Sequence, residues 1–403
     1  MNVLIRIEAD LISTLASFSR AADLNNLTFL AHAERVAHTS FRLGKALTLG
    51  QGELTELVLS ALLHDIGVMT DAEQLWLADL EPKASKISPH CRKGHSLLQS
   101  TQTFGSFALN VLEHHDYYSS DLRIIPAIIH VADRVDMLLN KKLYSLAQVE
   151  SLLQYFKRKA RRIFSPDVVD ALHGLAQIPS FWLDLEYGRY HFFDDGEDFK
   201  RVLSLEELEE LAQLMTILVD SKSPFTGHHS QGVTNVVGLL ATKLHMPEEK
   251  VRMIKIAGLL HDIGKLAIPD EILMYPGPLS KQQRTVMKQH TYHTYHLIKG
   301  IGPDAKGLAG WAAFHHERLN GTGYPFGLSA PDLELEARLM AVADITASLL
   351  ETRPYREGMS QDKVRQILHN NVNAGHIDAE LTDVAIAHLD EIIELVNTCN
   401  QSV

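Results

Sequence analysis

The chain has 403 residues, of which 45% are hydrophobic, and its mean hydropathy of −0.05 is typical of a globular protein of about two domains. The net charge of −12 argues against general binding of polymeric nucleic acid, which requires a basic face. The apolar runs end far short of a membrane span, and MNVLIRIEADLIS lacks the pattern of a signal peptide. Two cysteines, Cys91 and Cys399, provide no disulfide framework. We therefore expect a cytoplasmic protein with no membrane partner.

The expected secondary structure is helical along most of the chain. Apolar residues recur with helical periodicity at 32–47, 203–220, 233–245 and 390–399. Ser204 and Glu207 form a capping box at the start of the second of these segments. Only FWLDLEYGRYHFF at 181–193 alternates like a short β-hairpin. The sequence therefore predicts an all-α protein with a short hairpin between its two halves.

The two halves repeat one pattern of histidines and aspartates. LLHDIGV at 62–68 recurs as LLHDIGK at 259–265, and in each half another histidine lies 32 residues before the one in this motif. A lone histidine, a His-His pair and an aspartate follow each time. The first copy is His32, His64, Asp65, His90, His114, His115 and Asp133; the second is His229, His261, Asp262, His290, His315, His316 and Asp344. We predict an N-terminal domain at 1–180, a connector at 181–200 and a C-terminal domain at 201–403.

The second copy has the composition of a site for two metal ions. Its five imidazoles and two carboxylates are too many for one tetrahedral zinc ion, but they suit two octahedral ions bridged by a carboxylate. The mixed nitrogen and oxygen donors favour iron or manganese, with nickel, cobalt or zinc as substitutes. Such a pair of ions promotes in-line displacement at phosphorus by a hydroxide held between them. Lys265, three residues after Asp262, is placed to supply a positive charge to a phosphate or leaving oxygen.

Several motifs of the second half resemble those of the HD-GYP phosphodiesterases, a branch of the HD superfamily. These motifs are HDIGK, HHERLNGTGYP, RLMAVAD and RPYR, and the match covers about 200 residues. The resemblance implies a helical bundle with a metal centre that linearises a cyclic dinucleotide, cyclic di-GMP above all. The loop also has a physical reason, because glycines allow tight turns and proline stiffens the exit. A plain connector between helices is the alternative interpretation of the loop.

The resemblance also assigns roles to individual residues. One metal ion would take His229, His261, Asp262 and Asp344; the other would take His290, His315 and His316, with Asp262 bridging. Lys265 would assist the leaving group, which makes Asp262 and Lys265 the expected catalytic residues. The substrate would be bound by Gly321, Gly323, Tyr324 and Pro325 of the loop and by Arg353 and Arg356 of RPYR.

Three positions depart from the family pattern. Members with three metal ions carry a glutamate where this chain has Phe225 and an aspartate where it has Ala347. Both changes remove oxygen ligands of a third ion, so we predict two ions. The arginine of the family's HxxRV motif is replaced by Gly232, whereas the first copy keeps it as Arg35.

The first copy keeps all seven ligand positions but has Val68 in place of the lysine and lacks the GYP loop. Three interpretations remain open for it: a site that binds metal without catalysis, a metal-free structural cluster, or a separate activity, since bare HD domains include nucleotidases. Such a domain can act as a packing partner, a homodimer surface or a regulatory ligand site.

Tandem chains of this kind resemble members that hydrolyse 3′3′-cyclic GMP-AMP, so this messenger stands beside cyclic di-GMP as substrate.

Two other functions compete with the phosphodiesterase. The chain could be a receptor of low activity that binds the messenger and signals through a partner protein. It could also hydrolyse mononucleotides, as other HD domains do, but the GYP loop would then have no role.

Overall fold

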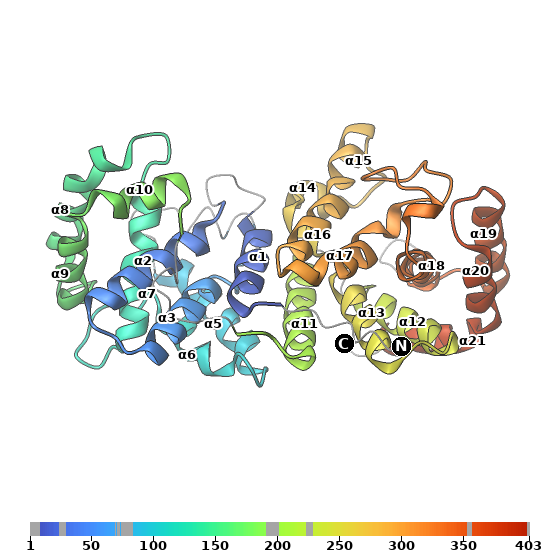
Figure 1. Ribbon diagram of the computed structural model, residues 1–403, viewed down its shortest axis with the longest axis horizontal. Coiled ribbons are helices and arrows are strands. Elements are labelled where there is room, and N and C mark those ends of the chain that lie inside the picture. Colours follow the sequence, from blue (N-terminus) through green and yellow to red (C-terminus); the bar gives the residue numbers. More distant parts are fainter. Residues whose placement is uncertain are drawn as a thin grey trace. The chain divides into compact units, whose positions relative to one another are not determined.

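The computed structural model describes residues 9–23, 30–68, 70, 73, 84–190, 201–222, 229–352 and 357–400. Within these ranges the regular secondary structure is helical, and the other residues form turns, loops and isolated β-bridges such as Asn320 with Ser329, which confirms the all-α prediction. The chain divides into two compact units. The N-terminal unit spans residues 18–201, and the C-terminal unit spans 202–403 together with the described residues 9–17 (Figure 1).

The N-terminal unit is a bundle around α2, α3 and α7. Its elements are the second half of α1 (Leu11–Asp23), α2 (His32–Ala46), α3 (Gln51–Leu63), α5 (Ala84–Gln99), η1 (Gly105–Phe107), α6 (Ala108–Glu113), α7 (Ile124–Leu138), η2 (Ser145–Gln148), α8 (Val149–Lys159), α9 (Pro166–Leu175) and α10 (Pro179–Tyr187). Helix α2 packs against α3, α7 and α9, and α5 packs against α6. Apolar side chains of α3 and α7, including Leu57 and Ile128, are fully buried between these helices.

The C-terminal unit repeats this bundle and extends it. Its elements are α11 (Leu205–Lys222), α12 (His229–Lys243), α13 (Glu248–Leu260), η3 (Ile263–Ala267), α14 (Asp270–Leu273), α15 (Lys281–Met287), α16 (Gln289–Lys299), η4 (Pro303–Ala305), α17 (Lys306–Ala313), η5 (Phe314–His316), η6 (Ala330–Asp332), α18 (Leu335–Leu350), α19 (Gln361–Asn373), α20 (Ala379–Ala387) and α21 (Leu389–Asn400). Helix α12 packs against α13, α18 and α21 (Figure 1). The predicted capping box is present: Glu207 N donates to Ser204 Oγ over 3.2 Å.

Corresponding helices begin and end at the predicted ligands. Helices α2 and α12 both have 15 residues and begin at His32 and His229. Helices α3 and α13 both have 13 residues and end one residue before the HD pair. The apolar run before each HD pair is buried, so it fixes the helix end in the core. The same local structure therefore presents the ligands in both units.

The glycine of HDIG brings the HD pair close to the next histidine. A Cβ atom on Gly264 would lie 1.9 Å from the carbonyl oxygen of His290, and one on Gly67 would lie 2.0 Å from that of His90. No larger residue fits at such a distance, because real Cβ atoms do not approach a backbone oxygen so closely. The turn after each HD pair can therefore pack directly on α16 or α5.

The predicted hairpin in the connector is wrong for the described residues. Residues 179–187 form α10, which begins at Pro179 and is followed by Gly188 with φ of +68°. Phe181, Trp182 and Leu185 are all buried, and this spacing of one and four residues belongs to one face of a helix. Residues 191–193 of the predicted hairpin lie outside the described residues.

The predicted start of the N-terminal domain also differs from the structure. Residues 9–17 group with the C-terminal unit rather than with residues 18–201. The reason is local bonding: Leu203 N donates to Ala9 O over 2.8 Å, and Ser17 Oγ donates to Leu297 O over 2.6 Å. On the C-terminal side, the units divide between residues 201 and 202, close to the predicted start of the second domain.

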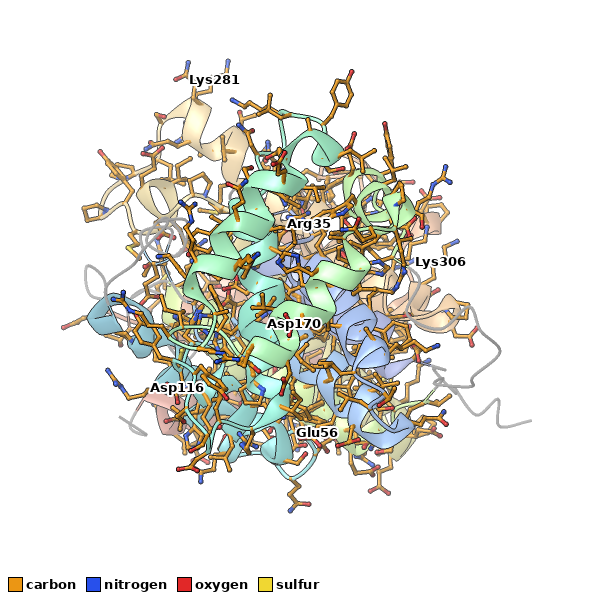
Figure 2. All side chains as sticks on the ribbon, turned by 90° about the vertical axis from the view of Figure 1, so that its left-hand side faces the viewer. Arg35, Glu56, Asp116, Asp170, Lys281 and Lys306 are labelled. Carbon is orange, nitrogen blue, oxygen red and sulfur yellow. The ribbon has the colours of Figure 1, made fainter. Side chains whose placement is uncertain are left out.

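Charged side chains differ in their exposure. Asp170 and Lys281 are exposed, whereas Arg35 is buried inside its unit (Figure 2). No helix among the described residues is both long enough and apolar enough to cross a membrane.

Candidate metal centres in the two units

The seven predicted ligands of the C-terminal unit meet in one cluster. His229 begins α12, His261 and Asp262 follow α13, His290 lies in α16, His315 and His316 end η5, and Asp344 lies in α18. His316 is half-buried and the other six are buried. Sequence spacing alone therefore identified residues that the fold brings together from five elements.

The first half of this cluster contains His229, His261 and Asp344. Their ligand atoms lie within 4.8 Å of one another. Asp344 Oδ1 lies 3.3 Å from His229 Nε2, and Asp262 Oδ2 lies 3.1 Å from His261 Nε2. His261 Nε2 is buried and makes no hydrogen bond of normal geometry. A buried nitrogen without such a bond is costly unless a metal ion takes its lone pair, so these donors fit a divalent ion.

The second half contains His290, His315 and His316, whose ligand atoms also lie within 4.8 Å of one another. His290 Nε2 lies 3.5 Å from His315 Nε2 and 3.4 Å from Asp262 Oδ1. The two oxygens of Asp262 thus face different halves of the cluster. This arrangement is compatible with the predicted bridging role of Asp262.

The imidazoles are oriented by hydrogen bonds on their Nδ1 side. His261, His290 and His315 donate from Nδ1 to the backbone carbonyls of residues 258, 287 and 312, over 2.7–2.8 Å. Each acceptor lies three residues before its histidine, so the helix that ends there also fixes the ring. With Nδ1 protonated, Nε2 is left as the ligand atom.

His229 is oriented by a carboxylate that sequence reasoning missed. Its Nδ1 lies 2.9 Å and 3.1 Å from the two carboxylate oxygens of Glu351, which is only 6% exposed. In the N-terminal unit the corresponding partner of His32 is Asp136, at 2.7 Å. Asp136 lies three residues after its ligand Asp133, whereas Glu351 lies seven residues after Asp344. The carboxylate that orients the first histidine of the pattern therefore lies one helical turn further along the chain in the C-terminal unit. A motif search cannot detect such a change.

Replacing Glu351 with alanine is expected to weaken metal binding at His229 by about 10–100-fold, because loss of such a carboxylate frees the ring and lowers its basicity. Metal titration monitored by calorimetry checks this. Glu351→Gln, which keeps one acceptor, should lose less. An Ala347→Asp substitution in the Glu351→Ala background places a carboxylate at the position of Asp136 and should restore affinity. Unchanged affinity in Glu351→Ala would show that the contact does not position His229.

Burial controls the protonation of the ligands. It lowers the pKa of His290 to about 3 and that of His315 to about 4, so both rings are neutral at pH 7. Burial alone would lower the pKa of His229 too, but hydrogen bonds to Asp344 and Glu351 raise it to about 10. Burial would raise the pKa of Asp262, yet His261 and Lys265 hold it well below its usual range. Most donors are therefore already in the form that binds metal.

Lys265 lies beside Asp262, as the three-residue spacing between them predicted. Its Nζ donates to Asp262 Oδ2 over 2.5 Å, and its side chain is 17% exposed. The lysine is held in η3 directly after the HD pair. Its charge therefore lies at the edge of the cluster, between the donors and solvent.

The GYP loop packs against the His-His pair. Tyr324 lies against His316 with ring centroids 4.9 Å apart, and its backbone N–H donates to His316 O over 3.2 Å. Gly321 has φ of +76°, and a Cβ atom on Gly323 would lie 2.4 Å from Glu317 Cα. Both positions therefore require glycine, as the sequence suggested. The loop therefore packs directly on the predicted cluster.

Glu317, the glutamate of HHE, is a second residue whose role sequence reasoning missed. It is 3% exposed, and its carboxylate accepts hydrogen bonds from Phe326 N over 2.7 Å and Leu328 N over 3.0 Å. These bonds hold the loop after Pro325 against the cluster. The motif contained Glu317, but only the fold shows what it binds. Arg353, Arg356 and Phe225 lie outside the described residues.

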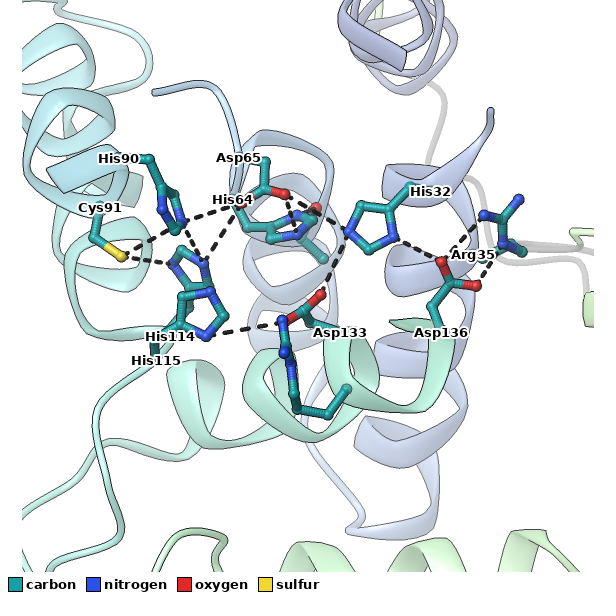
Figure 3. A network of polar contacts seen from close by, with 12 residues as sticks. His32, Arg35, His64, Asp65, His90, Cys91, His114, His115, Asp133 and Asp136 are labelled. Carbon is teal, nitrogen blue, oxygen red and sulfur yellow. Dashed lines mark hydrogen bonds and ion pairs between the residues drawn. The ribbon is translucent and has the colours of Figure 1, made fainter. Parts of the chain in front are cut away.

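The seven predicted positions of the N-terminal unit also meet in one cluster (Figure 3). His32 Nε2 lies 3.4 Å from Asp133 Oδ1, and Asp65 Oδ1 lies 3.2 Å from His90 Nε2. His64 and His114 donate from Nδ1 to the backbone carbonyls of residues 61 and 111, each over 2.7 Å. The arrangement of donors is thus the same as in the C-terminal unit.

The surroundings of the two clusters differ in their cations. Arg134 Nη2 donates to Asp133 Oδ2 over 2.8 Å, and Arg35 Nε donates to Asp136 Oδ1 over 2.5 Å. Lys141 Nζ forms a further ion pair with Asp136. The buried thiol of Cys91 lies 3.5 Å from His90 Nε2 (Figure 3). The positions aligned with Arg35 and Arg134 in the C-terminal unit are glycine and isoleucine.

Residues 212–381 match the family model described as HD domain. The chain is 29% identical over 398 residues to 3′3′-cGAMP-specific phosphodiesterase 1 of Vibrio cholerae, covering 94% of this chain and 91% of that protein. It is 38% identical over 164 residues to the cyclic di-GMP phosphodiesterase response regulator RpfG of Xanthomonas campestris, covering 40% of this chain and 43% of that protein.

The fold is similar to a solved structure of a cyclic GMP-AMP specific phosphodiesterase of V. cholerae, V-cGAP3. The TM-score is 0.67 at 22% identity, covering 95% of this chain and 98% of the other. The tandem arrangement of two helical units therefore recurs in that protein over almost its whole length.

Proposed function

We propose that the chain is a metal-dependent phosphodiesterase, because residues 212–381 match the HD domain family model and the same half of the chain carries the HD-GYP motif. Its C-terminal unit hydrolyses a 3′–5′ phosphodiester bond of a cyclic dinucleotide and releases the linear dinucleotide. The observation that carries this proposal is the position of Asp262 between two groups of imidazoles, with Lys265 on one of its oxygens. A metal-bridging carboxylate beside a fixed cation suits displacement at phosphorus.

The donors of the C-terminal cluster suit two divalent ions. His229, His261 and Asp344 would hold one ion, the three remaining histidines would hold the other, and Asp262 would serve both. We propose iron or manganese, with nickel, cobalt or zinc as substitutes. Bound there, such ions activate water and stabilise charge on phosphoryl oxygens.

The residues of the chain itself then orient the substrate and stabilise charge. Lys265 places a positive charge next to the reacting phosphate, where it stabilises a phosphoryl or departing ribose oxygen. Tyr324 presents a ring and a hydroxyl beside His316, and Glu317 keeps the loop in place. We propose that Gly321, Gly323, Tyr324 and Pro325, with Arg353 and Arg356, bind the substrate.

We propose 3′3′-cyclic GMP-AMP as the preferred substrate, with cyclic di-GMP as the second candidate. The support is that similarity to the cGAMP-specific enzyme of V. cholerae covers nearly the whole chain, N-terminal unit included, whereas similarity to RpfG covers 40% of it. The cytoplasmic location and the homodimer remain predictions.

Chromatography of the products tests this function. The purified full chain, loaded separately with Mn²⁺ and anaerobic Fe²⁺, is incubated with 3′3′-cyclic GMP-AMP, cyclic di-GMP and dGTP. We expect a linear dinucleotide, formed fastest from 3′3′-cyclic GMP-AMP and absent after chelation of the metal. Tight binding without turnover would support the receptor, and hydrolysis of dGTP alone would support a mononucleotide hydrolase.

A further inference from the structure

Cations pair with the carboxylates of the N-terminal cluster. The three carboxylates in contact with its imidazoles are Asp65, Asp133 and Asp136, and three cations, Arg35, Arg134 and Lys141, pair with the last two. With neutral imidazoles, these charges sum to zero. In the C-terminal unit the three carboxylates are Asp262, Asp344 and Glu351, and among the described residues Lys265 pairs with Asp262.

Arg134 occupies one half of the N-terminal cluster. Its Nε and Nη2 atoms donate to Asp133 Oδ2 over 3.0 Å and 2.8 Å, and the residue is 5% exposed. The aligned position in the C-terminal unit is Ile345. A divalent ion bound by Asp133 and His32 would lie close to this buried guanidinium. Repulsion between them is strong because little solvent screens it.

The other half of the cluster lacks such a cation. Asp65 contacts four imidazoles, and no Lys or Arg pairs with it among the described residues. Its Oδ1 atom is buried and makes no hydrogen bond of normal geometry. This oxygen lies 3.2 Å from His90 Nε2 and 3.8 Å from His114 Nε2 (Figure 3). An uncompensated carboxylate therefore faces the histidines of this half.

The spacing of these donors fits one small ion. His90 Nε2 and His114 Nε2 lie 3.3 Å apart, and His115 completes a group within 4.8 Å. Two ligand atoms on a tetrahedral zinc ion lie about 3.3 Å apart, given bond lengths of about 2.0–2.1 Å. Three imidazoles and one carboxylate are a sufficient donor set for four-coordination.

We propose that the N-terminal unit binds a single divalent ion of the zinc class through Asp65, His90, His114 and His115, with Arg134 replacing the second ion. One divalent ion brings the charge of this cluster from zero to +2. The ion joins the end of α3 to α5 and the residues after α6, so its role is structural. The inference does not depend on phosphodiesterase activity.

Metal counting by plasma mass spectrometry tests this inference on the full chain, saturated with Zn²⁺ and freed of excess. We expect three ions per chain in the wild type. Asp65→Ala should reduce the count to two, and Asp262→Ala should reduce it to one. Arg134→Ile, which copies the C-terminal unit, should raise it to four. In the Asp262→Ala protein loaded with Co²⁺, the remaining ion should give the intense visible absorption of a tetrahedral site.

A second pair of variants keeps the test decisive if Arg134→Ile fails to fold. His115→Ala removes a proposed ligand and should lower the count by one, whereas His32 is not a proposed ligand, so His32→Ala should leave three ions. Four ions in the wild type would overturn the inference, since both units would then hold pairs. Two ions, unaffected by Asp65→Ala, would overturn it as well, because the N-terminal cluster would then be metal-free.

Discussion

Replacing Asp262 with alanine is expected to reduce kcat/KM for the cyclic dinucleotide by at least about 10³-fold, a loss of ~4 kcal/mol in transition-state stabilisation. The physical reason is the position of the carboxylate. Its Oδ1 faces His290 at 3.4 Å and its Oδ2 faces His261 at 3.1 Å, so the variant removes a donor from both halves of the centre. It also removes the charge that pairs with Lys265. Steady-state hydrolysis, followed by chromatography of the linear product, measures the effect.

The matched control is Asp65→Ala, the same substitution at the aligned position of the N-terminal unit. We expect this variant to keep its kcat, because that unit has Val68 in place of the lysine and has no GYP loop. Circular dichroism and thermal unfolding show whether each variant folds. Equal losses of activity in Asp262→Ala and Asp65→Ala would contradict the assignment of catalysis to the C-terminal unit alone. Full activity in Asp262→Ala would contradict the proposed centre itself.

Three features could be predicted from the sequence because each rests on the spacing of residues. They are the fold class, the resemblance to HD-GYP proteins and the grouping of the ligands. Apolar periodicity is a property of neighbouring residues, and it gave the helices that the structure confirms. The repeat supplied a second copy of the ligand pattern, so His229 and His32 could be identified although no other ligand lies in the helix of either. The HDIG glycine was visible too, but its role depends on contact with His290, which only the fold shows.

The errors and omissions concern residues whose role depends on tertiary contacts. FWLDLEY alternates in polarity like a strand, but burial of Phe181, Trp182 and Leu185 on one side selects a helix. Glu351 and His229 are 122 residues apart, and no spacing rule joins them. Arg134 is adjacent to a ligand in sequence, yet whether its guanidinium turns toward the cluster or toward solvent is decided by packing. These missed residues are the ones that distinguish the two clusters.

Replacing Lys265 with alanine is expected to lower kcat for the cyclic dinucleotide by about 10²–10³-fold, as loss of one group that stabilises transition-state charge does in other enzymes. Lys265 Nζ lies 2.5 Å from Asp262 Oδ2 but is not among the predicted metal ligands. Metal content should therefore stay unchanged, which separates this variant from Asp262→Ala. Single-turnover kinetics with the metal content measured on the same sample check both statements. A loss of metal equal to the loss of rate would show that Lys265 only supports the centre.

The choice of substrate then shows which oxygen Lys265 stabilises. A ribose alkoxide is a poor leaving group and gains from a nearby cation, whereas the phenolate of bis(p-nitrophenyl) phosphate leaves without help. If Lys265 acts on the departing oxygen, Lys265→Ala should strongly lower the rate of hydrolysis of the cyclic dinucleotide and hardly change that of the aryl diester. If it acts on a non-bridging phosphoryl oxygen, both substrates should slow by similar factors. Arginine at this position keeps the charge but not the compact ammonium group, so Lys265→Arg should restore activity only in part. Full activity of Lys265→Ala on both substrates would show that catalysis does not need this lysine. Its replacement by Val68 in the N-terminal unit would then not explain a loss of activity there.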